Sequence, residues 1–97
     1  MRINETNRVA ANGAAAETIA LSALAWVLAD EARALRLLDL TGLTPEQLRG
    51  GLGDPAVLGA TLRFLESHEP DLIACAAAIG AAPAELVEAR QILEERP

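Results

Sequence analysis

His68 and Cys75 are the only histidine and the only cysteine in the chain, so they are the first candidates for chemistry. A nucleophilic thiol needs its base within hydrogen-bond distance. Pro70 lies between the two and is expected to begin a helix, which leaves His68 in the preceding turn and Cys75 more than a helical turn away. We therefore interpret them as a surface histidine and a small buried thiol.

A metal site is not expected around these residues either. Zn²⁺ takes three or four ligands, and the local candidates are His68, Glu69, Asp71 and Cys75, which have no recognised ligand spacing. The other carboxylates are expected to cap helices or to face water. The sequence predicts a protein that is not an enzyme, with no catalytic residue, no metal ion and no cofactor.

Two segments resemble functional motifs. Residues 50–53 read Gly-Gly-Leu-Gly, but no strand precedes them and no Lys-Ser/Thr pair follows, so we interpret them as a hinge. Residues 35–48 have the pattern of a helix-turn-helix with Gly42 in the turn. The second helix of that motif offers only Gln47 and Arg49 as polar side chains to read bases, which weakens this interpretation.

Hydrophobic periodicity predicts the helices that position these residues. Residues 14–29 are apolar around most of a helical circumference, which is typical of a helix in the middle of a bundle. No sustained alternation of β-branched or aromatic residues predicts a strand. We expect an all-α fold, a compact bundle of about five to six short helices at about 14–29, 31–41, 45–50, 55–67, 70–79 and 83–96.

Capping residues mark the expected helix ends. Asp30 is expected to cap one helix, and Thr44 with Gln47 forms the pattern of a capping box. Gly42 and Gly80 are expected to end helices in the left-handed conformation.

Burial is expected to differ along the chain. The helix at 31–41 is expected to bury Ala34, Leu35, Leu37 and Leu38. The helix at 70–79 is expected to be buried on most of its sides. Its small residues mark a central packing seam or a dimer contact; they are Ala74, Ala77 and Ala78.

A shift of 38 residues aligns the chain with itself. The aligned positions are a first-turn acid, a helix-ending glycine, a first-turn proline and core leucines, which predicts a pseudo-repeat of a 38-residue helical unit. Two similar hairpins with the same turn chemistry are the alternative. In the second copy Ala82 replaces the capping Thr44. The identical pairs are Leu24 and Leu62, Glu31 and Glu69, Gly42 and Gly80, Pro45 and Pro83, and Leu48 and Leu86.

Length and charge restrict the class of protein. A chain of 97 residues has room for one domain, which we place at residues 14–97 after a disordered N-terminal tail at residues 1–13. The net charge of −6 argues against nucleic acid and anionic membranes, and residues 14–29 are too short to span a bilayer. The single cysteine and the lack of an export signature favour a cytoplasmic location.

Two segments carry a resemblance to a known family. Residues 23–28 read Ala-Leu-Ala-Trp-Val-Leu, and residues 37–49 read Leu-Leu-Asp-Leu-Thr-Gly-Leu-Thr-Pro-Glu-Gln-Leu-Arg. They resemble domain-of-unknown-function family 3572, a small alphaproteobacterial family, and the likeness continues from Pro55 to Arg90. The resemblance implies a compact helical bacterial protein and supplies no catalytic or binding residues.

The large apolar rings of this chain are few. Trp26 and Phe64 are the only ones, so the core is thin and an interface would add burial. We therefore expect a protein-interaction module or a homodimer, with an unknown protein or a second copy as the partner. The alternatives are a helix-turn-helix-like DNA-binding regulator and a carrier of a small apolar ligand. The candidate partner contacts are Trp26, Arg33, Arg36 and Phe64.

Overall fold

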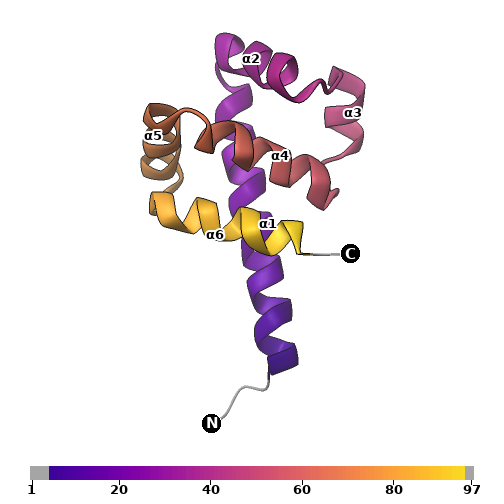
Figure 1. Ribbon diagram of the computed structural model, residues 1–97, viewed down its shortest axis with the longest axis vertical. Coiled ribbons are helices and arrows are strands. Elements are labelled where there is room, and N and C mark those ends of the chain that lie inside the picture. The colour runs from indigo at the N-terminus through magenta and orange to yellow at the C-terminus, as the bar shows by residue number, and fades with distance from the viewer. Residues whose placement is uncertain (1–4, 96–97) are drawn as a thin grey trace.

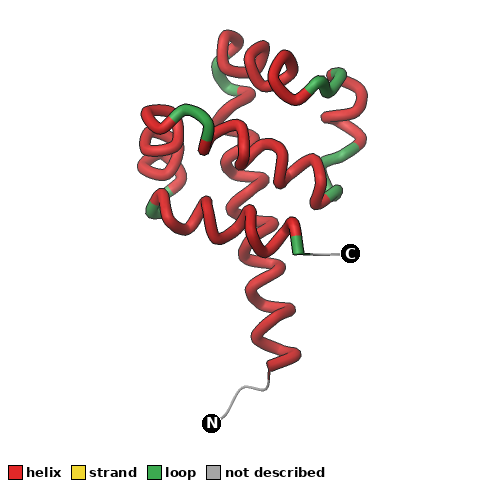
Figure 2. Tube along the Cα trace, in the orientation of Figure 1, coloured by secondary structure: helices red, strands yellow, loops and turns green. Residues whose placement is uncertain are grey.

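The computed structural model describes the backbone of residues 5–95 and the side chains of residues 13–95. Figures 1 and 2 show helices joined by short turns and no strand in this part of the chain, which confirms the all-α prediction. The helices are α1 (Glu5–Leu28), α2 (Glu31–Thr41), α3 (Pro45–Gly50), α4 (Pro55–Glu66), α5 (Glu69–Ile79) and α6 (Pro83–Glu94).

The expected caps are confirmed. The Asp30 carboxylate accepts a hydrogen bond of 3.0 Å from the backbone N–H of Arg33 at the start of α2. Thr44 and Gln47 form the capping box of α3, with hydrogen bonds of 3.1 and 2.9 Å. Gly42 and Gly80 end α2 and α5 with φ of 74° each, which favours glycine over residues that have a Cβ.

Helix α1 begins at Glu5, earlier than the expected start near Ala14. No proline interrupts residues 5–13, so nothing in this region stops the helix from extending towards the N-terminus. Of the tail expected at residues 1–13, residues 1–4 lie outside the described residues. The remainder belongs to the backbone of α1, whose first turns extend beyond α6 (Figure 1).

The helices form two layers, and α1 lies in one of them (Figure 1). Helices α4 and α6 cross α1 on one side, α5 lies beside it, and α2 leaves its C-terminal end after a sharp bend (Figure 1). The molecule measures 47 × 27 × 18 Å. A helix with its side chains is about 10 Å across, so the shortest dimension accommodates about two helices. Helix α1 is therefore an outer layer and not the middle of the bundle.

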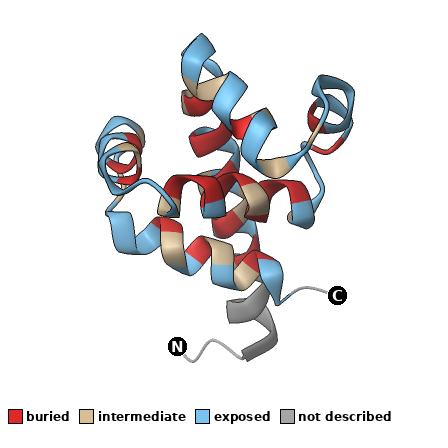
Figure 3. Cartoon of the chain, turned by 45° about the horizontal axis from the view of Figure 1, so that its top comes forward, coloured by how far each residue is buried: buried red, intermediate tan, exposed pale blue. Residues whose placement is uncertain are grey.

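The core lies between α1, α4 and α6 (Figure 3). Leucines of these three helices supply most of its largest fully buried side chains, together with Leu37 from α2. Thr61 is buried among them, and its hydroxyl donates a 3.1 Å hydrogen bond to the carbonyl of Val57, which satisfies it. The largest fully buried apolar side chains are Leu24, Val27, Leu37, Leu58, Leu62, Leu65, Leu86 and Leu93.

Two expectations about burial are wrong. In α2, Leu37 is fully buried, whereas Leu35 is 59% exposed. Helix α5 lies at the edge of the bundle and buries only one stripe, formed by Leu72, Cys75 and Ala76. Alanine side chains are compatible with water or with a core, so composition did not show which side of α5 is covered. The exposed alanines of α5 do not form the expected packing seam, and the alternative of a dimer contact there stays a prediction; they are Ala74, Ala77 and Ala78.

Helix boundaries recur with the predicted offset. Glu31 and Glu69 begin α2 and α5, and Pro45 and Pro83 begin α3 and α6, so both pairs of positions are 38 residues apart. The third helices differ, because α3 has 6 residues and α6 has 12. Recurring caps are expected from a duplication and from two similar hairpins alike, so the pseudo-repeat stays a prediction.

Candidate functional site

The two residues considered first for chemistry lie in different surroundings. Cys75 is fully buried, and desolvation raises the pKa of its thiol to about 11, so the thiol is protonated at neutral pH. His68 is exposed at the start of α5, with its Nδ1 atom 3.1 Å from Oδ2 of Asp71. Both positions agree with the interpretation of a buried thiol and a surface histidine.

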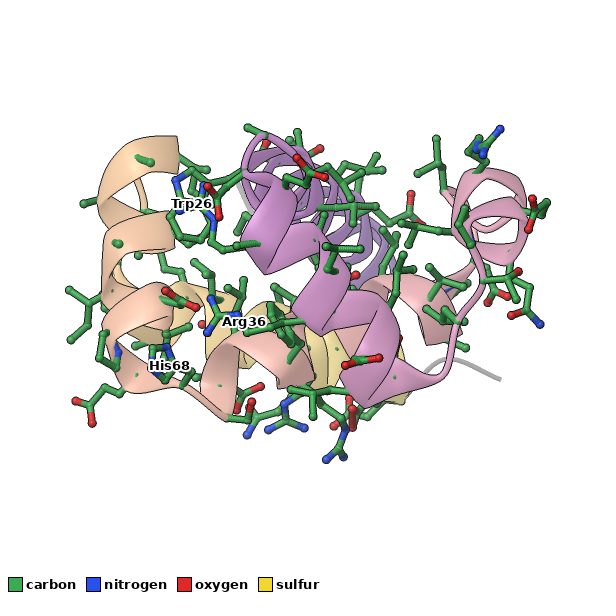
Figure 4. The ribbon with its side chains drawn as sticks, turned by 90° about the horizontal axis from the view of Figure 1, so that it is seen from above. Trp26, Arg36 and His68 are labelled. Carbon is green, nitrogen blue, oxygen red and sulfur yellow. The ribbon has the colours of Figure 1, made fainter. Side chains whose placement is uncertain are left out.

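Three predicted partner contacts lie together between the end of α1, α2 and α5 (Figure 4). The Arg33 guanidinium lies 3.5 Å from the centroid of the Trp26 ring, and its Nη2 donates a 3.1 Å hydrogen bond to the Trp26 carbonyl. Arg36 donates a 3.0 Å hydrogen bond to Asp71 on α5. The cation–π contact and the ion pair hold α2 against α1 and α5.

The fourth predicted contact, Phe64, lies on α4 and is largely buried. It contributes to a groove of about 410 Å³ between α2 and α4. Leu40, on the same groove, is 70% exposed and is the most exposed large apolar side chain among the described residues. The groove is lined by Leu40, Thr41, Ala60, Arg63, Phe64 and Ser67.

Ionic contacts join α4 to α6. Glu94 accepts hydrogen bonds from Arg63 and Arg90, and Arg90 also donates one to Glu66. The hydrogen bond from Arg63 is the main cause that lowers the pKa of Glu94. Hydrogen bonds to these carboxylates raise the pKa of both arginines. These charges hold two core helices together.

The α1 face is a surface that the sequence analysis did not identify. We define it as six exposed residues on the side of α1 opposite its buried stripe, and none of them is charged. Leu21 and Leu28 are 41% and 42% exposed. The α1 face consists of Ala14, Thr18, Leu21, Ser22, Ala25 and Leu28.

The opposite stripe of α1 explains why this face was missed. It is fully covered by the bundle and consists of Ala16, Ala20, Ala23, Leu24 and Val27. A helix that is apolar on both sides is expected in the middle of a bundle, but α1 is covered on one side only. The sequence did show that α1 is apolar around most of its circumference. Only the arrangement of the helices in layers shows that one of these apolar sides is exposed to solvent.

The alternative functions find little geometric support among the described residues. Helix α3, the expected recognition helix, has 6 residues, and the Gln47 side chain accepts a hydrogen bond from the backbone N–H of Thr44 at its own cap. The hollow between α1 and α6 has a volume of about 140 Å³, and both this hollow and the groove of about 410 Å³ between α2 and α4 are open to solvent and do not enclose a ligand. The DNA-binding and ligand-carrier alternatives stay predictions.

The described residues contain no group of three or more His, Cys, Asp or Glu side chains placed to hold a metal ion. No single helix in the described part of the chain has both the length and the apolar character to cross a membrane. Two pairs of helices meet these criteria only when each is counted across its bend, α1 from Gly13 with α2 and α5 with α6.

The fold and these surfaces define a small all-α protein of two helix layers. Comparison with family models then gives the particular family: the chain belongs to the proteins of unknown function DUF3572, whose model matches residues 13–96. This confirms the resemblance found at residues 23–28 and 37–49. Comparisons with curated proteins and with solved structures found no match.

Proposed function

We propose that this protein is a non-catalytic interaction module that binds another protein chain across the α1 face. The observation that carries the proposal is the lack of charge on an exposed helix face in a chain of which 23% of residues are charged. Soluble helices normally present charged or polar residues to water. An uncharged exposed face loses little on desolvation and gains about 25 cal/mol per Å² of apolar area that a partner covers.

The use of the charged residues elsewhere supports the proposal. Arg63, Arg90 and Glu94 join α4 to α6, and Arg36 joins α2 to α5. The buried Cys75 thiol has a raised pKa, which makes it a poor nucleophile. These contacts stabilise a scaffold, and the uncharged side of that scaffold is left to bind a partner.

The earlier candidates take different roles in this proposal. Trp26 lies one helical turn after Ser22 and is half-buried, which places it at the edge of the α1 face. Arg33 and Arg36 connect helices within the chain, because the Arg33 guanidinium contacts Trp26 of α1 and the Arg36 guanidinium contacts Asp71 of α5. Phe64 mainly packs in the hydrophobic core, because its side chain is largely buried.

The test is photo-crosslinking in living cells from the α1 face. A photoreactive phenylalanine analogue replaces Leu21 and, in a control, Leu52, which is exposed to a similar extent at 45%. We expect cross-linked protein products from position 21 above the control, and we expect the additional substitution Leu28→Glu to reduce them. Equal yields from positions 21 and 52 would overturn the proposal.

A further inference from the structure

We infer that the chain bound at the α1 face is a second copy of this protein, packed antiparallel about a two-fold axis near Leu21. This inference rests on the proposed function and specifies the partner. Four observations lead to it: the spacing of the face, its self-complementarity, the state of its hydroxyl at Thr18, and the open side of α1.

The spacing of the α1 face matches helix pairing. Its residues Ala14, Thr18, Leu21, Ala25 and Leu28 follow each other at intervals of four, three, four and three. This alternation keeps a stripe straight along one side of a helix and is the pattern of the seam between two paired helices. The seam extends for about 21 Å at 1.5 Å per residue.

The face is complementary to itself when two copies run antiparallel. With Leu21 facing Leu21 of the second copy at the axis, Ala14 faces Leu28 of the second copy at each end. Thr18 then lies nearest to Ala25 of the second copy, about 1.5 Å out of register along the helix axis because the two residues are three and four positions from Leu21. Each leucine at an end of the seam is thus placed against an alanine, which leaves room for it. A two-fold interface requires this matching of one surface with itself.

The Thr18 hydroxyl already has the hydrogen bond that it would need inside an interface. The hydroxyl donates a 3.0 Å hydrogen bond to the carbonyl of Ala14 within α1. A buried hydroxyl without a partner would cost free energy, whereas this one already has an acceptor. Alanines beside it allow close approach of two helix backbones, as small residues do at helix interfaces.

The layer arrangement leaves room for the second copy. Helices α4 and α6 cross α1 on the opposite side, and the molecule is only 18 Å deep. In Figure 4, seen from above, α1 lies at the upper edge of the molecule, with α4 and α6 below it. Pairing would place α1 between its own bundle and that of the second copy. It would then have the central position that its apolar circumference predicts.

The first experiment measures the mass in solution by sedimentation equilibrium. We expect about twice the chain mass of 10.2 kDa for the natural sequence. Leu21→Glu places two carboxylates together at the axis, where like charges cost several kcal/mol, and should raise the dissociation constant at least about 100-fold. Leu52→Glu is the control, since Leu52 is similarly exposed, and it should leave the dimer intact. Circular dichroism checks that both variants keep their helices.

The second experiment tests the position of the axis. Leu21→Cys should give a covalent homodimer on mild oxidation, because a disulfide requires Cα atoms about 4.4–6.8 Å apart. Leu52→Cys should not do so at a comparable rate. The natural Cys75 does not compete, because it is fully buried. A Leu21→Cys variant that forms a covalent dimer no faster than Leu52→Cys, or forms none, would overturn the inference.

The outcomes separate this inference from the proposed function. A natural protein that is monomeric at about millimolar concentration, where an interface weaker than about −4 kcal/mol dissociates, overturns the homodimer. If position 21 still cross-links to a different protein in cells, the proposed function stands without it. If position 21 cross-links to nothing, both are wrong. If Leu21→Glu dissociates no more than Leu52→Glu, the interface lies on another surface, and the inference is overturned.

Discussion

The α2–α3 pair and the α5–α6 pair use the same local chemistry and make different contributions to the core. Each pair has a left-handed glycine, a following proline at the first helical position and a buried leucine, Leu48 or Leu86. Helix α3 stops at Gly50, whereas α6 continues to Glu94 and packs across α1 and α4. Capping determines where a helix starts, and the length of the apolar pattern after the cap decides whether the helix joins the core.

Burial follows the same offset even where the residue types differ. Leu37 in α2 and Cys75 in α5 are 38 residues apart, and both are fully buried. Leu35 and Ile73, with the same separation, are both half exposed or more. The two pairs therefore present corresponding sides to the bundle, and the following predictions test how far this correspondence holds.

The largest effect is expected from Leu37→Ala. Removal of a fully buried leucine side chain should lower the free energy of unfolding by about 2–5 kcal/mol. Leu35→Ala, in the same helix, should change it by no more than about 0.5 kcal/mol because Leu35 is exposed. Urea unfolding measures both. Equal losses would show that the side of α2 facing the core is assigned incorrectly.

The next largest effect is expected at the glycine-rich hinge of residues 50–53, between α3 and α4. A Cβ at Gly51 would lie 2.5 Å from Cγ2 of Val57 and 2.9 Å from the carbonyl oxygen of Gln47. Gly51→Ala should therefore destabilise the protein by about 1–3 kcal/mol. A Cβ at Gly50 meets nothing within 4 Å, so Gly50→Ala should be neutral or stabilising. Thermal unfolding that ranks the two variants in the opposite order would contradict the close contact at Gly51.

The caps of α3 and α6 differ by one side chain. The Glu85 carboxylate accepts a 2.9 Å hydrogen bond from the backbone N–H of Ala82. The Ala82 side chain has no oxygen that could accept a hydrogen bond from the backbone N–H of Glu85 in turn. Ala82→Thr should complete the box and stabilise the protein by about 1 kcal/mol, while Thr44→Ala should destabilise it by a similar amount. The melting temperature should shift by about 4–8 °C in each direction. An unchanged or lower melting temperature for Ala82→Thr would argue against this helix start.

The smallest effect concerns pH and the ionic contacts of Glu94 in α6, which have no counterpart in the shorter α3. Contacts with Arg63 and Arg90 lower the pKa of Glu94 from its usual 4.5, so its contribution is complete above that value. The contribution is lost as the pH falls through the lowered pKa of the folded state. Glu94→Gln should therefore be less stable than the natural protein at pH 7, and the difference should disappear in strong acid. Glu95→Gln is the control, and equal stability of the two variants at pH 7 would remove the assigned role of Glu94.

Much of the local structure was predictable, because its determinants lie within a few residues. Asp30, Thr44 and Gln47 form their cap hydrogen bonds to backbone groups no more than three residues away. The candidate site was predicted less well. The α1 face was not identified, and Arg36 was predicted as a contact for a partner, without its ionic partner Asp71, which lies 35 residues away in the same chain.

The sequence by itself determined the fold class, most of the helix ends and the family. These depend on periodicity, on short-range hydrogen bonds and on a residue pattern that spans most of the chain. Only the tertiary structure decided which sides of α1 and α5 are covered. Alanine-rich helices are apolar on several sides, so the buried side is selected by the helices that pack against them. For α1 that selection left one uncharged face exposed to solvent.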